Sequence, residues 1–473
     1  MGIVSALFEV IMSVFGFIID TVMDLLSGLV SPRRKTKYDA DWGTVSAGAT
    51  RKKDVGFRVA SWYNSKKAAN SHLLVAAGTG GGKSTNVVHR ILLEPADNCA
   101  YVVLDTNGDL SEQTSGYLHQ VKRPIYYFDV EKEYSIRLNF IKSSKTLEDL
   151  HKNVHVLMAN SYEGAHDYWF QSGENLIYFS ASVLWKFAEP QYVNIANVIH
   201  MLLTFSFAPQ KVDRWIVEHC DEQTVNQYKS LCATPQKTLQ CSISTALNAL
   251  HIYTTAKVQS ITNDTTFSLQ QLRDEGGILY LTASAASAHH YRSIYGIIIQ
   301  NFFNEILQTP VSEKDNDVVF LLDEIGNITI PGLPQFLSLC RKRKVSVATL
   351  WQDLTGQIVK SYGKDGASTI LANSAVKAFL PGAKPAETCA MLERLLGKFN
   401  YEEDHQVKSR ELLTAQEIFQ TKDILLLDNN KPPLRIKPAP FFENKTLLKR
   451  SQLPPYIPTA STTLPSPTLL DFS

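Results

Sequence analysis

The residue pattern with the clearest chemistry is a glycine-rich turn between an apolar stretch and a Lys-Ser-Thr sequence. Residues 72–85 read HLLVAAGTGGGKST. In such a turn, glycines let successive backbone N–H groups point at phosphate oxygens, and the helix that follows directs its positive end at the same anion. A lysine and a hydroxyl at the end of the turn are placed to reach the phosphates and a magnesium ion. The sequence therefore predicts a nucleoside triphosphate site.

Each residue of this turn has an expected role. Lys83 is predicted to reach the β- and γ-phosphates, and Ser84 to hold Mg²⁺. Ala77 stands where the usual pattern has its first glycine, but the later glycines keep the backbone permissive. The alternative is a flexible loop between a strand and a helix. The predicted nucleotide-binding residues are Gly78, Thr79, Gly80, Gly81, Gly82, Lys83, Ser84 and Thr85.

A second apolar run ends in two adjacent carboxylates. Residues 317–324 read DVVFLLDE, and a continuous apolar run is typical of a strand covered on both faces. Such a strand places Asp323 at the carboxyl end of the sheet, where α/β folds bind ligands. We expect Asp323 to orient Mg²⁺ together with Ser84, and Glu324 to polarise the attacking water. Either carboxylate alone is also compatible with an ordinary helix cap.

A third strand-like run, residues 345–351, lies between a basic sequence and an amide. Gln352 at its end can sense the γ-phosphate, and Arg341, the first residue of the preceding RKRK, can reach the nucleotide of a neighbouring subunit. This interpretation predicts a ring of subunits. In the alternative, Gln352 is a surface residue and the basic run is a solvated helix end that suits the helix dipole. Spacing alone leaves both interpretations open.

Composition sets the frame for these motifs. The chain has 473 residues, of which 44% are hydrophobic, which is enough for two or three domains with cores of their own. A net charge of +1 gives no global sign of nucleic-acid binding, although local basic patches can still provide it. The six cysteines never occur as C-x-x-C, which is typical of reduced, cytosolic thiols rather than of a zinc site.

The first thirty residues differ from the rest of the chain. Residues 1–30 are almost entirely apolar, with a narrow polar stripe at helical spacing that includes Glu9 and Asp20. The uncharged stretch 10–19 is too short to span a membrane alone, since a span takes about 20 residues. Three interpretations remain open: an interfacial helix, a transmembrane helix whose stripe faces a bundle, and a helix docked on a partner. Residues 31–58 carry eight Lys and Arg against three Asp, which favours a cytoplasmic location for everything downstream if the helix spans.

Apolar strand patterns alternate with helical patterns over most of the remaining chain, which predicts a doubly wound α/β sheet. Residues 150–260 are the exception, because they show helical periodicity and no strand run. We therefore expect an inserted all-α domain. The expected strands are 72–77, 101–105, 125–129, 278–282, 318–323, 345–351, 376–380 and 423–428.

These patterns divide the chain into six parts. The expected divisions are a membrane-associated amphipathic helix (1–30), a basic linker with the start of the nucleotide domain (31–69), the first part of that domain (70–149), the all-α insertion (150–260), the second part of the nucleotide domain (261–445) and a tail (446–473). The tail is rich in Pro, Ser and Thr and is predicted to be disordered, with a small docking element at residues 469–472.

A succession of motifs carries a family resemblance through most of residues 70–440. The motifs are AGTGGGKST (77–85), DTNGDL (105–110), LLDEIGNI (321–328), RKRKVSVATLWQDLTGQI (341–358), YGKDGASTILANSAVKAFLPG (362–382), AETCAMLERLLG (386–397) and SRELLTAQEI (409–418). Together they resemble the type IV secretion coupling proteins of the TraG/TraD type, ATPases of the FtsK/HerA lineage. Thr106 and Asn107 depart from the family's DPKGEL turn by replacing its Pro and Lys.

The resemblance implies a RecA-like P-loop NTPase that binds ATP and Mg²⁺ and forms a homohexamer. It makes Arg341 an arginine finger and Gln352 a γ-phosphate sensor. It also implies DNA, bound through its phosphates, a relaxase with accessory transfer proteins, and the type IV secretion channel as partners. The implied location is the bacterial inner membrane, with the ATPase domain in the cytoplasm. Family members usually have two membrane spans and this chain has one short segment, so a separate small membrane protein is a further candidate partner.

The function predicted from these observations is an ATP-driven coupling protein that recruits a DNA–relaxase substrate to a type IV secretion channel and pumps DNA during conjugation. Lys83, Ser84, Asp323, Glu324 and Arg341 would carry the hydrolysis. Two alternatives stay open: a nucleotide-binding docking adaptor that selects protein effectors, and a soluble DNA-stimulated translocase ATPase.

Overall fold

The computed structural model of the chain describes most residues beyond the N-terminal segment. The described residues are 39–44, 54–164, 166–284, 286–382, 384–403, 406–429, 431–459 and 466–472. The predicted membrane-associated helix (1–30) and most of the basic linker lie outside them. None of the helices in this described part combines the length and apolarity that crossing a bilayer requires.

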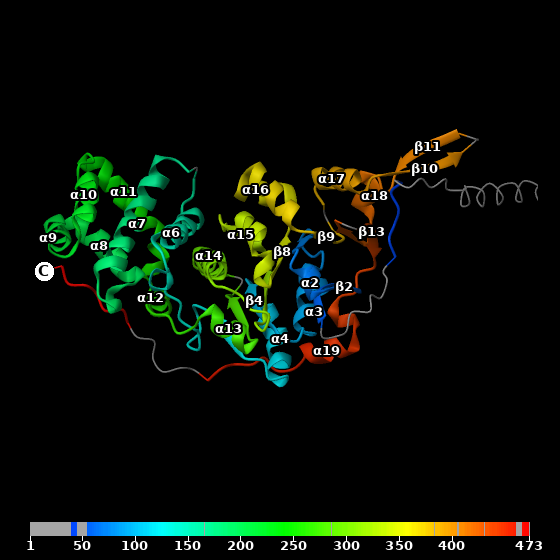
Figure 1. Ribbon diagram of the computed structural model, residues 1–473, viewed down its shortest axis with the longest axis horizontal. Helices are drawn as coiled ribbons and strands as arrows, with labels where there is room; N and C mark the ends of the chain where they lie inside the picture. The colour runs from blue at the N-terminus through cyan, green and yellow to red at the C-terminus, as the bar shows by residue number, and fades with distance from the viewer. Residues whose placement is uncertain are drawn as a thin grey trace, which may run out of the picture.

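A nine-stranded sheet forms the centre of the described structure (Figure 1). Its order is β13-β12-β9-β3-β8-β7-β4-β6-β5, parallel from β9 to β5 and antiparallel at β12 and β13. The strands are β3 (Leu73–Ala76), β4 (Cys99–Asp105), β5 (Ile125–Phe128), β6 (Ile278–Thr282), β7 (Asp317–Leu322), β8 (Val345–Trp351), β9 (Val376–Phe379), β12 (Ile424–Asp428) and β13 (Lys431–Ile436).

Alternate side chains of the strands enter two separate cores, one on each face of the sheet. On β3, Leu74 joins the core that contains side chains of α14 (Arg292–Gln308), whereas Leu73 and Val75 join the core that contains Val88 of the helix after the phosphate loop. A sheet buried on both faces needs continuously apolar strands, which is why β3, β4 and β8 are buried along their whole length. The mixed α/β architecture with a mainly parallel sheet is therefore as predicted.

The parallel register brings four strand ends to one edge of the sheet. Ala76 of β3 pairs with Trp351 of β8, and Leu322 of β7 pairs with Leu104 of β4. The segments that leave these ends are the glycine-rich turn, the Gln352 region, the acidic pair and the DTNGDL turn. Residues separated by more than 200 positions in sequence thus meet at the carboxyl edge, where open α/β sheets bind ligands.

The structure contains all eight predicted strands and several that sequence patterning missed. β13 (Lys431–Ile436) carries two consecutive prolines, which argue against a central strand, but it pairs with β12 at the edge, where proline is tolerated. Two small antiparallel hairpins were also not predicted. They consist of β1 (Val55–Val59) with β2 (Trp62–Ser65), and β10 (Lys398–Glu403) with β11 (Gln406–Glu411).

Helices cover the sheet and connect its strands. The main helices of the nucleotide part are α2 (Lys66–Ala69), η2 (Ser84–Val88), which continues as α3 (His89–Leu92), α4 (Asp109–Gln120), α14 (Arg292–Gln308), α15 (Leu333–Leu339), η6 (Cys340–Arg343), η7 (Leu354–Ile358), α16 (Val359–Asn373), α17 (Ala386–Leu396), α18 (Ala415–Gln420), η8 (Phe441–Glu443) and α19 (Lys445–Ser451).

Between β5 and β6 the described residues form helices and no strand. These helices are α5 (Phe140–Ser143), α6 (Leu147–Ser161), α7 (Tyr168–Phe187), α8 (Ile195–Phe207), α9 (Pro209–His219), α10 (Glu222–Cys232), α11 (Gln236–Ala249), α12 (Ala256–Thr262) and α13 (Leu269–Glu275), with short η3 (Pro190–Tyr192) and η4 (His251–Thr254) turns between them. Helices α6 to α12 gather at one end of the molecule, opposite the β10–β11 hairpin, whereas α13 lies against the sheet (Figure 1).

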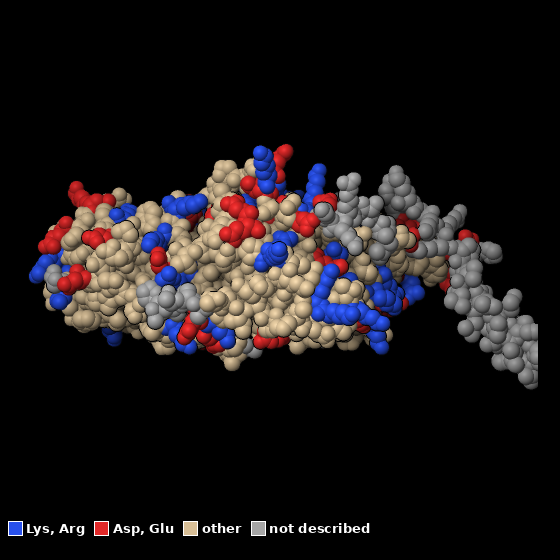
Figure 2. All heavy atoms as spheres, turned by 90° about the horizontal axis from the view of Figure 1, so that it is seen from below, with Lys and Arg blue, Asp and Glu red and all other residues tan. Residues whose placement is uncertain are grey.

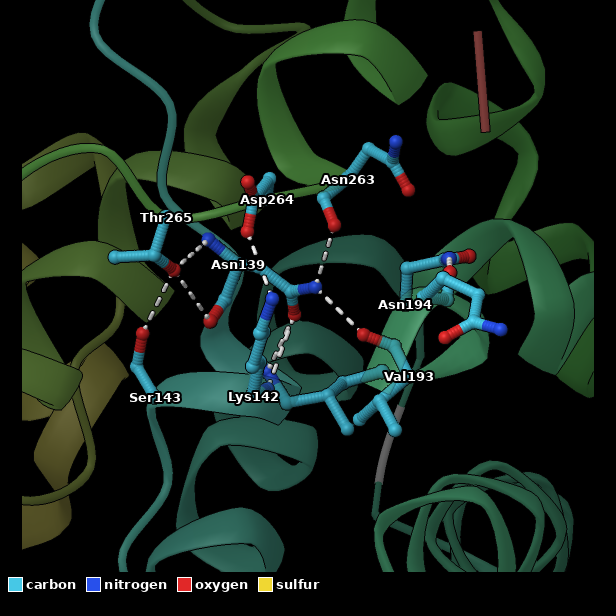
Figure 3. Close-up of polar contacts among 10 residues, drawn as sticks. Asn139, Lys142, Ser143, Val193, Asn194, Asn263, Asp264 and Thr265 are labelled. Atoms are coloured by element: carbon cyan, nitrogen blue, oxygen red, sulfur yellow. Dashed lines mark hydrogen bonds and ion pairs between the residues drawn. The ribbon is translucent and has the colours of Figure 1, made fainter. Parts of the chain in front are cut away.

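The chain enters and leaves this helical part through two segments that are hydrogen-bonded to each other (Figure 3). The side-chain amide of Asn139 donates to the backbone oxygens of Val193 (2.7 Å) and Asn263 (2.8 Å). Thr265 accepts from the backbone N–H of Asn139 (3.1 Å), and Lys142 contacts Asp264 at 2.9 Å. The two connections are therefore held together at one point, which fixes where the helices attach to the sheet.

The C-terminal tail departs from the prediction of disorder. Residues 452–459 run against α4, where Tyr456 stacks on His119 with ring centroids 4.2 Å apart. Residues 466–472 lie on the helical part, which the end of the chain reaches in Figure 1. The prediction of disorder is wrong for residues 452–459, whose composition is rich in proline but which pack against α4. At residues 469–472 the packed end of the chain agrees with the predicted docking element.

The end of the tail is held by α8 and α9. Asn197 donates to the backbone oxygen of Thr468 (2.9 Å) and accepts from the backbone N–H of Leu470 (2.8 Å). Phe472 is only 4% exposed and contacts the rings of His200 and Trp215.

Phe472→Ala is expected to release this end of the tail. Burial of a Phe side chain contributes about 1.5–3 kcal/mol, so opening of the segment should increase by roughly tenfold or more. Hydrogen exchange of residues 466–472 measures this opening. Leu469→Ala is the matched control, because Leu469 is exposed, and it should leave exchange unchanged. Equal exchange in both variants would contradict the anchoring role of Phe472.

Candidate nucleotide-binding site

The phosphate loop connects β3 to the helix η2–α3. Gly82 has φ +77°, in the left-handed region that favours glycine. At Gly81 an added Cβ would lie 2.6 Å from the backbone oxygen of Pro381, so a side chain would collide with the segment after β9. The loop therefore requires glycine at these two positions. The first helical turn after it is a π-helix, a distortion that often occurs at functional sites.

Lys83 lies at the floor of this loop. Its side chain is largely buried, and its Nζ donates to the backbone oxygen of Ala77 at 2.9 Å. Burial lowers the pKa of Lys83, while the nearby Asp323 and Glu324 carboxylates oppose that shift. A partly desolvated ammonium group held by a single carbonyl is well suited to exchange that contact for phosphate oxygens.

The hydroxyl of Ser84 donates a short hydrogen bond to Oδ2 of Asp323, which brings the predicted metal-binding pair together. Asp323 is buried, and its burial raises its pKa to about 6 despite the hydrogen bond from Ser84, which lowers it. A hydroxyl and a carboxylate side by side offer the oxygen ligands that Mg²⁺ prefers. The residues present thus fit a magnesium ion at this position.

Glu324 occupies a constrained backbone position next to this pair. Its φ of +52° is unusual for a residue with a side chain, and such strain is found mainly at functional sites. Its Oε1 accepts from Nε2 of Gln352 at 3.3 Å, and its Oε2 lies 3.5 Å from Oγ1 of Thr106. The carboxylate is thereby held between two neighbouring strand ends.

The DTNGDL turn has two separate tasks. Asp105 accepts hydrogen bonds from the backbone N–H groups of Ser111 (2.8 Å) and Leu110 (3.2 Å), which fix the start of α4. Burial raises the pKa of Asp105 to about 6. Thr106 instead faces Glu324, so the position where the family pattern has proline here contributes a hydroxyl to the acidic pair.

A cavity of about 670 Å³ opens over these groups, within the usual size range of ligand sites. Most of the predicted nucleotide-binding residues and Glu324 line it, whereas Asp323 lies behind Ser84 and Gln352 behind Glu324. The lining residues are Thr79, Gly80, Gly81, Gly82, Lys83, Ser84, Thr85, Asn86, Glu324, Pro381, Gly382, Pro438, Pro440, Phe442 and Glu443. Gly78 accepts the backbone N–H of Gly81 at 3.0 Å and so shapes the loop from outside the lining.

Arg341 is the predicted site residue that the fold does not bring to this cavity. It is exposed in η6, before the amino end of β8, whereas the phosphate loop leaves the carboxyl end of the parallel strand β3. The length of β8, about 20 Å, separates the two edges. Two other basic residues of the same run have structural contacts: Arg343 donates to Thr309 and Lys344 to Glu313, both at backbone oxygens.

Sequence reasoning missed the wall formed after β13 and the residue that attaches it. Asn86 donates to the backbone oxygen of Gly82 (2.9 Å) and accepts from the backbone N–H of Ala439 (2.8 Å). The available signal was the side-chain amide one turn after the phosphate loop. The proline-rich sequence KPAPFFE (437–443) carried no pattern that predicts a ligand wall.

Solved structures with a similar fold are forms of the bacterial conjugative coupling protein TrwB. The trigonal form of TrwBdeltaN70 with sulphate has a TM-score of 0.69 at 18% identity, covering 86% of this chain and 95% of that chain. TrwB with ADP and Mg²⁺ has a TM-score of 0.70 at 18% identity, with the same coverage. TrwB with the GTP analogue GDPNP has a TM-score of 0.69 at 19% identity, again with the same coverage.

Sequence comparison adds the family. A search of curated proteins found no match. Among protein families, residues 30–464 match the family described as Type IV secretory system Conjugative DNA transfer. This match spans well over half of the chain and includes every residue of the site described above. The chain therefore belongs to the type IV secretory system conjugative DNA transfer family, the coupling proteins of conjugation.

Proposed function

We propose that this protein is a Mg²⁺-dependent ATPase that drives DNA through a type IV secretion channel during conjugation. The observation that carries the proposal is the hydrogen bond between Ser84 and Asp323, with Glu324 next to it, beneath an open phosphate loop. TrwB, whose fold this chain shares, has been solved with ADP and Mg²⁺ and with an ATP analogue, which supports nucleotide binding here.

Each residue of the site would have a separate role in ATP hydrolysis. Lys83 and the loop amides would hold the β- and γ-phosphates, and Ser84 with Asp323 would hold Mg²⁺. When bound, Mg²⁺ supplies charge neutralisation on the phosphates. Glu324 would accept a proton from the attacking water, and Gln352 positions the Glu324 carboxylate through their 3.3 Å contact. Gln352 would sense γ-phosphate occupancy through the same contact.

The placement of Arg341 supports assembly of several subunits. An exposed arginine at the edge of the sheet opposite to the cavity cannot serve the nucleotide of its own chain, but it can serve that of a neighbour. A homohexameric ring would place each Arg341 at the next subunit's site. The arginine would then stabilise transition-state charge in trans.

Contact with DNA would be made through phosphates and without reading of bases. The face in Figure 2 carries both signs of charge, with Lys and Arg side chains most dense toward the end where β13 and α19 lie. Local basic groups of this kind are compatible with a net charge of only +1. Relaxase, accessory transfer proteins and the channel are the proposed protein partners, at the cytoplasmic face of the bacterial inner membrane.

Residues 1–30 are the proposed membrane attachment. Their apolar face would enter the bilayer while the Ser/Glu/Asp stripe packs against a helix of another subunit or of a small membrane protein. The observation that supports this proposal is the apolar sequence of residues 1–30 with its polar stripe at helical spacing.

Binding of Mg²⁺ and ATP is expected to weaken as the pH falls through about 6. Asp323 has its pKa raised to about 6 by burial, so protonation below that value removes the charge that attracts the metal. Because ATP itself titrates, the measurement is the ratio of affinities of the native protein and of Asp323→Asn, by calorimetry from pH 8 to pH 5. We expect the affinity of the native protein relative to that of Asp323→Asn to decrease about tenfold between pH 7 and pH 5. A ratio that does not change with pH would contradict the assignment of Asp323 to the metal.

A further inference from the structure

The outer part of the cavity is built from a segment that the proposed hydrolysis does not use. Beyond the phosphate loop, Pro438, Pro440, Phe442 and Glu443 line the cavity. They belong to the stretch between β13 and α19, far from the phosphate loop in sequence. Two proline rings and a planar phenyl ring are apolar, unlike the glycine amides and the lysine at the inner end.

Side chains of the helix after the phosphate loop hold this segment in place. Asn86 accepts from the backbone N–H of Ala439 at 2.8 Å, and Arg90 donates to the backbone oxygen of the same residue at 2.8 Å. The ring of His89 stacks on that of Phe441, with centroids 4.5 Å apart. The position of the wall relative to the phosphates is therefore fixed by three residues within one turn of the same helix.

The two adjacent phenylalanines of the segment have different surroundings. Phe441 is buried against His89 and anchors the segment. Phe442 is 50% exposed and faces the cavity, with its ring nearly perpendicular to that of Phe441 (75°). A rigidly mounted, solvent-accessible aromatic ring at the mouth of a phosphate site is a surface to which a base can stack.

We propose that Phe442 stacks against the purine base of the bound nucleotide and is the base subsite of this pocket. The inference rests on the proposed nucleotide binding at the phosphate loop. A nucleotide has an anionic phosphate chain at one end and a flat aromatic base at the other. The phosphate loop would bind the first end, and Phe442 would bind the second. Stacking on a phenyl ring favours a purine because of its larger π-surface, without contacting the edge of the base.

The test compares a ligand that carries adenosine with one that consists of the phosphate chain alone. Mg²⁺-ATP and Mg²⁺-tripolyphosphate share the phosphate chain, but only ATP has a base for Phe442 to contact. Calorimetry with the full chain should show that Phe442→Ala binds ATP about tenfold more weakly and binds tripolyphosphate as the native protein does. Phe442→Tyr should keep the affinity for ATP. A second measurement uses Phe442→Trp, whose added fluorescence should change on binding ATP and not on binding tripolyphosphate.

A control variant and the possible contrary results distinguish failure of the base contact from failure of nucleotide binding itself. Phe419→Ala is the matched control, because Phe419 is 55% exposed on α18 and does not line the cavity, and it should bind both ligands normally. Equal loss of both ligands in Phe442→Ala, or no loss of either, would overturn the base contact. So would a change in oligomeric state with an unaltered ratio of the two affinities, since Phe442 would then be an interface residue. A native protein that binds neither ligand would overturn the nucleotide site itself.

Discussion

Glu324→Gln is expected to bind ATP with the affinity of the native protein and to hydrolyse it about 10²–10⁴-fold more slowly. The amide has the same shape as the carboxylate, so its contacts with Gln352 (3.3 Å) and Thr106 (3.5 Å) can persist. The phosphate loop and the Ser84–Asp323 pair that hold the ligand are untouched. Only the ability to accept a proton from water is lost.

Steady-state hydrolysis and equilibrium binding must be measured on the same preparation of this variant. Glu313→Gln is a suitable control, because Glu313 is an exposed carboxylate distant from the cavity lining, and it should hydrolyse ATP normally. Hydrolysis by Glu324→Gln at the native rate would show that another group activates the water. Loss of binding together with turnover would show that Glu324 acts on the ground state of the complex.

Mixing two inactive variants is expected to restore part of the activity. Arg341→Ala should lose about 10³–10⁵-fold in turnover if the guanidinium stabilises the transition state, and Lys83→Ala should lose it through the phosphate contact. Random mixing in a ring pairs an intact phosphate loop with an intact Arg341 at about one interface in four. Rescue of this kind requires that the arginine act across the interface.

A control variant and two possible results decide whether Arg341 acts across the subunit interface. Lys342→Ala, at the exposed neighbour of Arg341, should keep native activity and serves as the control. If subunits are shown to exchange and no activity returns, Arg341 is not a finger acting in trans. Full activity of the Arg341→Ala variant on its own would show that Arg341 has no catalytic role and belongs to a solvated helix end, the alternative interpretation of the sequence.

The parts of the site that sequence could predict are those fixed by local chemistry. The glycine-rich turn, the two apolar strands and the residues that follow them were enough to bring Lys83, Ser84, Asp323, Glu324 and Gln352 to one edge of a parallel sheet. Parallel strands align their carboxyl ends, so a residue directly after one strand meets residues directly after its neighbours. Recognising the strands in the sequence was therefore enough to predict that residues far apart in the chain meet at this edge of the sheet.

The parts that sequence could not predict depend on packing between distant segments. The segment Pro438–Glu443 follows an edge strand whose prolines argued against a strand. Asn86, His89 and Arg90 attach it to the helix after the phosphate loop. The tail is similar, because Phe472 is buried only where it packs against rings of α8 and α9. No pattern within either segment indicates the partner against which it packs.

The most direct test of the central claim is ATP hydrolysis by the purified full chain, with and without DNA, and with residues 2–30 present or deleted. A coupling motor predicts that DNA of unrelated sequences stimulates hydrolysis to similar extents, that added salt reduces the stimulation because phosphate contacts are lost, and that Glu324→Gln abolishes it. Deleting residues 2–30 should leave nucleotide binding intact and release the protein from membranes. Hydrolysis that no DNA stimulates at low salt, in the full chain and the deletion alike, would contradict the account.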